Sequence, residues 1–129
     1  MGQPSRDVVL LTGDGGFITA VGELSTAVQE GIRLRVVLFN DGGYGILRNL
    51  QDQHFEGRRF GVDLRTPDFV RLAESFDVWS AQVRSAVEMG PVLKEALAQA
   101  GPALIEVDML AVGPMAAPFT GSARLVPNR

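Results

Sequence analysis

Two short apolar runs, each ending in a glycine-rich segment, constrain this chain more than any other feature. Residues 8–11 (VVLL) lead directly into residues 12–16 (TGDGG), and residues 35–39 (RVVLF) lead into residues 40–43 (NDGG). Continuous apolar runs of this length are typical of strands that are buried on both faces of a parallel sheet. A helix between two such strands forms a right-handed βαβ unit. The sequence therefore predicts a βαβ unit with a glycine-rich loop after each strand.

The predicted connecting helix has apolar side chains at helical spacing and a glycine, Gly31, where a helix usually ends. These apolar residues are Phe17, Val21, Leu24, Ala27 and Val28. The alternation of helices and strands continues to residue 108. We predict a short helix over 44–53, a helix from Thr66-Pro67-Asp68 to about Phe76, a strand over 78–83, a helix beginning after Ser85 or at Pro91, and a strand over 103–107. This order predicts an α/β three-layer sandwich with a mainly parallel sheet.

The end of the chain has a different composition. From Met109 onward the sequence is rich in proline, glycine and alanine and shows no periodicity. We therefore expect a domain over residues 1–108 and an extended tail over residues 109–129.

Composition excludes several classes of function. The 129 residues are 46% apolar and 21% charged with a net charge of −3, which is typical of a globular protein and disfavours nucleic-acid binding. The absence of cysteine excludes disulfides, thiolate catalysis and cysteine-based zinc sites, and a single histidine excludes a multi-histidine metal site. No apolar run approaches the roughly 18 residues needed to span a membrane, and the first residues do not resemble a signal peptide. We expect a cytoplasmic protein.

The two glycine-rich loops are the candidate binding site, because ligands of open α/β sheets lie beyond the carboxyl ends of the strands. Glycines at 13, 15 and 16 let backbone N–H groups approach an anion such as phosphate. The carboxylate of Asp14 suits such a site if Mg²⁺ lies between it and the phosphate, and Asp41 can supply a second carboxylate. A lone Gly-Asp-Gly-Gly also fits a surface turn. Ile18 argues against a dinucleotide fingerprint, and the lysine of a phosphate-binding P-loop is missing.

The pair of loops resembles the diphosphate-binding (C-terminal) domain of thiamine-diphosphate (ThDP) enzymes, which carry Gly-Asp-Gly and then Asn-Asn or a close variant. From residue 14 to residue 41 is 27 positions, the interval that this family uses between its two side-chain metal ligands. Three further segments are similar to acetolactate synthases and their relatives: residues 22–27 (GELSTA), 66–76 (TPDFVRLAESF) and 101–107 (GPALIEV). The resemblance covers about residues 7–108.

The resemblance implies a set of site residues. Asp14, Asp41 and the backbone carbonyl of Gly43 would bind Mg²⁺, and backbone amides around Gly15, Gly16, Gly45 and Ile46 would hold the diphosphate. Gly13 and Tyr44 complete the expected cofactor-binding set. One position departs from the family, because most relatives have Asn where this chain has Asp41. The extra negative charge could tighten metal binding and weaken diphosphate binding.

The resemblance also implies a function that this chain does not perform alone. Family members are decarboxylases and carboligases (lyases and transferases) that act on 2-keto acids, and their active site forms against a second, pyrimidine-binding domain of the same or a partner subunit. A preceding strand and helix of the family are also missing, so the fold would be truncated on its N-terminal side. We expect an inactive fragment of a longer enzyme, and the alternative interpretation is a subunit of a split enzyme.

The exposed sheet edge predicts a homo-oligomer. The alternative functions are a non-catalytic binding module of the same fold and an unrelated phosphate- or nucleotide-binding domain.

Overall fold

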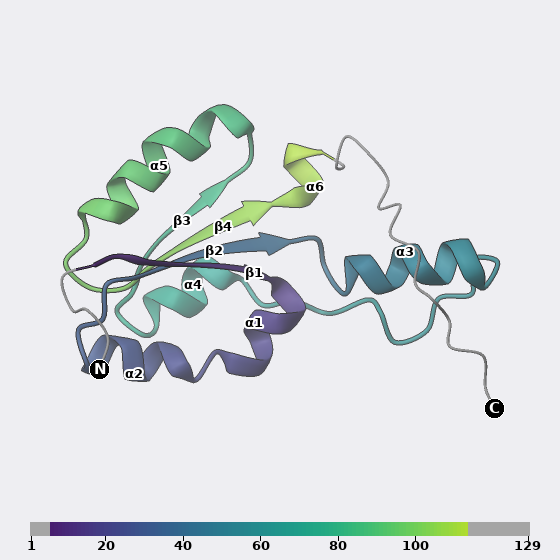
Figure 1. Cartoon of the computed structure of the whole chain (residues 1–129), viewed down its shortest axis with the longest axis horizontal. Coiled ribbons are helices and arrows are strands. Elements are labelled where there is room, and N and C mark those ends of the chain that lie inside the picture. The colour runs from purple at the N-terminus through teal and green to yellow at the C-terminus, as the bar shows by residue number, and fades with distance from the viewer. Residues whose placement is uncertain (1–5, 114–129) are drawn as a thin grey trace.

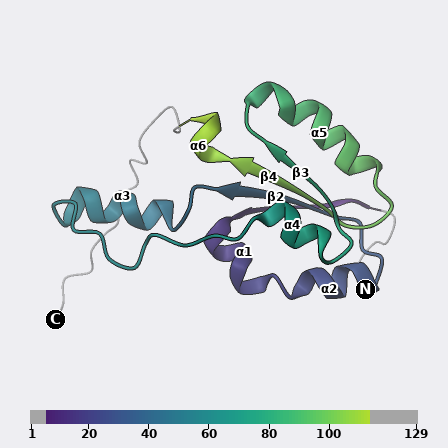
Figure 2. The same cartoon turned by 180° about the vertical axis from the view of Figure 1, so that it is seen from behind.

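The computed structural model describes residues 6–113 and contains one sheet covered by helices on both faces (Figure 1). Its four strands are β1 (Val8–Gly13), β2 (Leu34–Asn40), β3 (Trp79–Val83) and β4 (Ala103–Asp108). They are all parallel and lie in the order β1-β2-β4-β3. Helices α1 (Asp14–Ala20), α2 (Glu23–Gln29) and α4 (Phe69–Glu74) cover one face, and α5 (Ala86–Ala98) covers the other (Figures 1 and 2). The predicted three-layer α/β sandwich is confirmed.

Each face of the sheet carries its own apolar core. The core under α1, α2 and α4 includes Phe17, Leu24, Val36, Leu38, Phe69, Ala73, Val78 and Leu104. The core under α5 includes Val37, Val83, Ala96, Ala103, Ile105 and Val107, with Trp79 packed against it. Consecutive residues of β2 and β4 alternate between the two cores, as expected of central strands of a parallel sheet.

Strand β1 lies at the edge of the sheet, which agrees with the exposed sheet edge expected where the family's preceding strand is missing. Among the strands within residues 6–113, only β2 pairs with it, and Val8, Val9, Leu10 and Leu11 are 41–66% exposed. The prediction that this run is buried on both faces is wrong, because α1 contacts β1 but leaves its apolar side chains partly exposed. The chain therefore presents an apolar, unpaired sheet edge.

The predicted helix between the first two strands is instead two helices, α1 and α2, turned relative to each other below the sheet (Figure 1). The break lies at Val21 and Gly22, where Leu24 and Ser25 donate backbone hydrogen bonds to residues only three positions earlier. Glycine has a low helix propensity, and such short-range bonds tighten the turn. The end at Gly31 is confirmed: its φ is +60°, and the amides of Gly31 and Ile32 donate to the carbonyls of Val28 and Ala27.

One predicted helix start is shifted, and of the two starts considered for the next helix the structure has the one after Ser85. Helix α4 begins at Phe69, because Asp68 is its cap and its side chain accepts from the Arg71 amide; the helix ends at Glu74, before Phe76. Helix α5 begins at Ala86 and contains Pro91 in its interior. The proline removes only the hydrogen bond to the carbonyl of Val87, a residue that is 83% exposed and can bond to water.

The end of the sheet domain also differs from the prediction. Residues Met109–Val112 form a short helix, α6, whose cap is Asp108: its carboxylate accepts from the amides of Leu110 (3.1 Å) and Ala111 (3.0 Å). The expected tail therefore begins as a helix, and its remaining part, residues 114–129, lies outside the described residues. Within residues 6–113, no helix combines the length and apolarity required to cross a bilayer.

Helix α3 (Gly45–His54) confirms the short helix predicted over 44–53, and it lies away from the sheet, beyond the carboxyl end of β2 (Figures 1 and 2). None of its residues is buried, and Ile46 and Leu47 are nearly half exposed. Its start is nevertheless fixed, because the segment before it pairs with residues 62–64.

Candidate functional site

The carboxyl ends of β1 and β2 bring the two glycine-rich loops together. Because the strands are parallel and in register, Gly13 lies opposite Phe39, and Asn40 lies opposite Asp108 of β4. An open cavity of about 1040 Å³ lies at this edge of the sheet. Six of the nine residues predicted for the cofactor line it: Gly13, Asp14, Asp41, Gly43, Gly45 and Ile46.

Asp14 is the most buried charged group of this cavity, with only 1% of the residue exposed. One carboxylate oxygen accepts from the amide of Gly15 and the other from the amide of Gly43, both at 2.8 Å. Burial raises the pKa of Asp14 and the charge of Asp41 raises it further, while the amide hydrogen bonds oppose the shift. A buried carboxylate that feels a second carboxylate favours a cation, since a bound cation offsets both burial and repulsion.

The loop that carries Gly43 is held by a second segment of the chain. Gly42 accepts from the Leu64 amide (3.0 Å), and the Tyr44 amide donates to Val62 (2.8 Å). A Cβ at position 43 would overlap the carbonyl oxygen of Val62 and the guanidinium of Arg48. Within residues 6–113, no hydrogen bond to the Gly43 carbonyl is found, so this oxygen is available as a metal ligand.

The start of α3 provides backbone donors. Its N-cap, Tyr44, makes no side-chain cap hydrogen bond, and within the described part of the chain the amides of Gly45 and Ile46 have no acceptor. The first amides of a helix are directed at an anion that binds there. A Cβ at Gly45 would overlap the carboxylate of Asp41, which would have to move from its present position.

Three predicted residues do not line the cavity. The amide of Gly15 donates to Asp14, and the ring of Tyr44 lies against Gly15, where it would block a Cβ. Gly16 is exposed in the first turn of α1. Gly15 and Tyr44 therefore support the Asp14 carboxylate, and among the described residues the Gly15 amide is not free to bind an anion, whereas those of Gly45 and Ile46 are.

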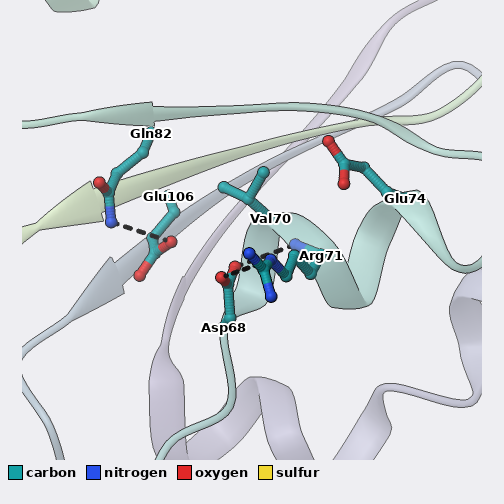
Figure 3. Close-up of a pocket in the computed structure, with 6 residues that line it drawn as sticks. All are labelled: Asp68, Val70, Arg71, Glu74, Gln82 and Glu106. Atoms are coloured by element: carbon teal, nitrogen blue, oxygen red, sulfur yellow. Dashed lines mark hydrogen bonds and ion pairs between the residues drawn. The ribbon is translucent and has the colours of Figure 1, made fainter.

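Sequence reasoning missed a polar network beneath the second loop. The Asn40 side chain donates to Glu106 (2.7 Å) and accepts from the Gly42 amide (3.2 Å), and Gln82 also donates to Glu106 (3.4 Å). Figure 3 shows Gln82 and Glu106, on neighbouring strands, directed toward each other beside a smaller cavity of about 380 Å³. Glu106 is only 4% exposed. A charged residue within an otherwise apolar strand, 103–107, is the sequence signal that could have revealed it.

Sequence reasoning also missed Arg48. It lies one turn of α3 after Tyr44 and lines the large cavity. Its Nη2 donates to the Asp41 carbonyl (2.9 Å) and lies 3.5 Å from the carboxylate oxygen Oδ1 of the same residue. The site thus contains two carboxylates and a free carbonyl, which are ligands that fit Mg²⁺. It also contains free backbone amides and the Arg48 guanidinium, which fit a diphosphate.

Comparison with known proteins identifies the family of this domain. Residues 1–107 match the family described as thiamine pyrophosphate enzyme, C-terminal TPP binding domain. The chain is 35% identical over 100 residues to the acetolactate synthase large subunit of Corynebacterium glutamicum, covering 74% of this chain and 16% of that protein. It is 31% identical over 117 residues to the 3D-(3,5/4)-trihydroxycyclohexane-1,2-dione hydrolase of Halalkalibacterium halodurans, covering 85% of this chain and 18% of that protein.

A solved structure gives the same result. The thiamine diphosphate-dependent 4-hydroxybenzoylformate decarboxylase of Rhodococcus jostii RHA1 has a TM-score of 0.76 and 36% identity, covering 82% of this chain and 20% of that one. The chain spans about a fifth of the length of these relatives. It belongs to the thiamine pyrophosphate enzymes, as a C-terminal TPP-binding domain.

Proposed function

We propose that this chain binds Mg²⁺ and the diphosphate of ThDP for a decarboxylase or carboligase that acts on 2-keto acids. The observation that carries the proposal is the Asp14 carboxylate, buried between the amides of Gly15 and Gly43 and facing the charge of Asp41. Asp14, Asp41 and the Gly43 carbonyl would hold the metal. The amides of Gly45 and Ile46 would hold the diphosphate.

In this proposal the cofactor supplies the reactive groups and the residues of the chain supply its binding site. Bound ThDP supplies the nucleophilic carbon and the electron sink for cleaving the bond between the keto carbon and the carboxylate of the substrate. The chain's own residues bind and orient the cofactor. The Gly42–Tyr44 loop is fixed from two sides, by Asp14 and by residues 62–64, so the metal ligands are placed before the cofactor arrives.

Two surfaces support the proposal that a pyrimidine-binding domain, from the same or a partner subunit, completes the active site. Helix α3 has no buried residue and lies beside the cavity with Ile46 and Leu47 exposed, and β1 is an apolar sheet edge. Exposed apolar surfaces of this kind are typical of interfaces. We therefore propose that the 129-residue chain alone is inactive and that the intact enzyme is a homo-oligomer.

Calorimetry with ThDP at saturating Mg²⁺ tests the binding function. We expect Asp14→Ala to abolish ThDP binding, because it removes the buried ligand and the acceptor of the Gly43 amide. We expect Asp41→Asn to keep or improve ThDP affinity, since the amide oxygen still ligates and one negative charge is lost. Normal ThDP binding by Asp14→Ala would refute the assignment of the site.

Two alternatives are separated by further assays. If the chain and its parent enzyme bind neither Mg²⁺ nor ThDP, the chain is a non-catalytic module of the same fold.

The substrate class is tested in the intact enzyme with pyruvate and benzoylformate, by release of carbon dioxide. Turnover of a cyclic 1,2-dione but of neither keto acid would instead favour the chemistry named in the hydrolase of H. halodurans.

A further inference from the structure

We propose that Arg48 is the residue that lets this site accept a diphosphate although its second carboxylate position holds Asp41. In this inference, which rests on the proposed function, the guanidinium neutralises Asp41 and sets the affinity for the cofactor's anionic end. Arg48 is a positioning and specificity-determining residue that has no part in bond breaking.

The contacts of Arg48 are directed at Asp41. Its Nη2 donates to the Asp41 backbone carbonyl at 2.9 Å and lies 3.5 Å from the Oδ1 of the carboxylate. The Arg48 side chain is 19% exposed, whereas that of Asp41 is 36% exposed and faces the cavity. The backbone contact fixes the guanidinium beside the carboxylate without occupying both of its oxygens. Asp41 is thereby left with a free edge for a metal.

The shape of the loop makes room for this cation. A Cβ at position 43 would collide with Nη2 of Arg48, so the glycine admits the guanidinium to the metal side of the loop. The Nε of Arg48 is buried and has no hydrogen-bond partner within the described residues. It lies 3.3 Å from Asp63, whose side chain is 72% exposed and therefore screened by water. Arg48 also lines the cavity, so its positive charge lies close to an anion that binds there.

The charge balance explains why a cation is needed. Among the groups that line the cavity, Asp14 and Asp41 contribute two negative charges, and Arg48, which also pairs with the exposed Asp63 outside it, contributes one positive charge. Replacing Asp41 by Asn and Arg48 by Gln together would leave the same sum of these charges. The effect of Arg48 should therefore depend on which residue stands at position 41.

A double-mutant cycle tests this dependence, with ThDP affinity measured by calorimetry at saturating Mg²⁺ and Mg²⁺ affinity measured alone. We expect Arg48→Gln to weaken ThDP binding about tenfold or more in the presence of Asp41, and by less than about threefold when combined with Asp41→Asn, since pairing between close charges is lost only in the first case. Mg²⁺ alone should bind more tightly to Arg48→Gln, because Asp41 then carries an uncompensated charge. Arg48→Lys should retain most of the ThDP affinity.

Matched controls separate the outcomes. Arg71→Gln removes an 85%-exposed guanidinium on α4 and should change neither affinity. Thermal unfolding followed by Trp79 fluorescence shows which variants are folded. If Arg48→Gln does not fold, Arg48→Lys replaces it in the cycle. Equal losses of ThDP affinity with Asp41 and with Asn at position 41 would overturn the role of Arg48 but not the proposed function. Failure of the unsubstituted chain to bind ThDP would overturn both.

Discussion

Replacing Glu106 with leucine should loosen the second loop from beneath. The carboxylate accepts from Asn40 at 2.7 Å and from Gln82 at 3.4 Å, and Asn40 in turn accepts from the Gly42 amide. Leucine has a similar volume, so the main change is the loss of both acceptors at a residue that is 4% exposed. The Asn40 amide is then left in a partly buried position without a partner.

The expected cost follows from that lost partner. Leaving a buried donor unsatisfied costs about 1–3 kcal/mol, so we expect the free energy of unfolding to fall by about 2 kcal/mol. For a domain of this size, that corresponds to a decrease in Tm of roughly 6–10 °C. Glu106→Gln keeps one acceptor oxygen and should cost about half as much, since a neutral acceptor is weaker than a carboxylate.

Urea unfolding followed by the fluorescence of Trp79, the chain's only tryptophan, measures this change. Gln82→Leu is the control: Gln82 is exposed and its bond to Glu106 is long, so its loss should cost less than about 0.5 kcal/mol. We also expect Glu106→Leu to weaken ThDP binding, because Gly42 and Gly43 lose the support of Asn40. A Glu106→Leu protein as stable as the unsubstituted chain would show that the network does not hold the loop.

Three further changes test other parts of the structure. Gly45→Ala should weaken Mg²⁺ binding at least tenfold by calorimetry, since its Cβ would displace the Asp41 carboxylate, while Gly90→Ala, which meets nothing within 4 Å, should bind normally. Phe69→Ala should lower the free energy of unfolding by about 3–5 kcal/mol, because Phe69 is fully buried and packs edge-on against Phe17; a loss below about 1 kcal/mol would contradict that packing. The hydrogen bond from Arg33 lowers the pKa of Asp7 below 3.8, so its stabilising effect is present above pH 3.8 and is lost as the pH falls through the lowered value. Acid titrations should therefore show that Asp7→Asn is less stable than the unsubstituted chain at neutral pH and that the difference shrinks below pH 3.8; an unchanged difference would contradict the ion pair.

The sequence alone was enough to predict the layers and the two loops. Apolar runs at 8–11 and 35–39 followed by glycines indicate parallel strands, because few other arrangements bury such runs and then turn sharply. The edge position of β1 was expected only from the family resemblance, since a run of four apolar residues looks the same at the centre of a sheet and at its edge. The break at Gly22 was also missed, because the apolar spacing continues across it.

The candidate site was predictable only in part, for a similar reason. Asp14 and Asp41 stand at strand ends, and a local pattern shows this. Glu106 and Asp63 act on the second loop from distant parts of the sequence, and only the register of β2 with β4 and the pairing of residues 62–64 bring them there. The assignment of free amides to α3 instead of to Gly15 depends on where the Asp14 carboxylate points, which no sequence pattern specifies.

The most direct measurement is a crystal structure of the chain with ThDP and Mn²⁺ in place of Mg²⁺, with the metal located by its anomalous scattering. We expect one ion in direct contact with a carboxylate oxygen of Asp14, a carboxylate oxygen of Asp41 and the carbonyl oxygen of Gly43, with diphosphate oxygens on its other side. An anomalous peak that contacts neither aspartate, or a diphosphate bound away from the start of α3, would contradict the assignment of this edge of the sheet as the cofactor site.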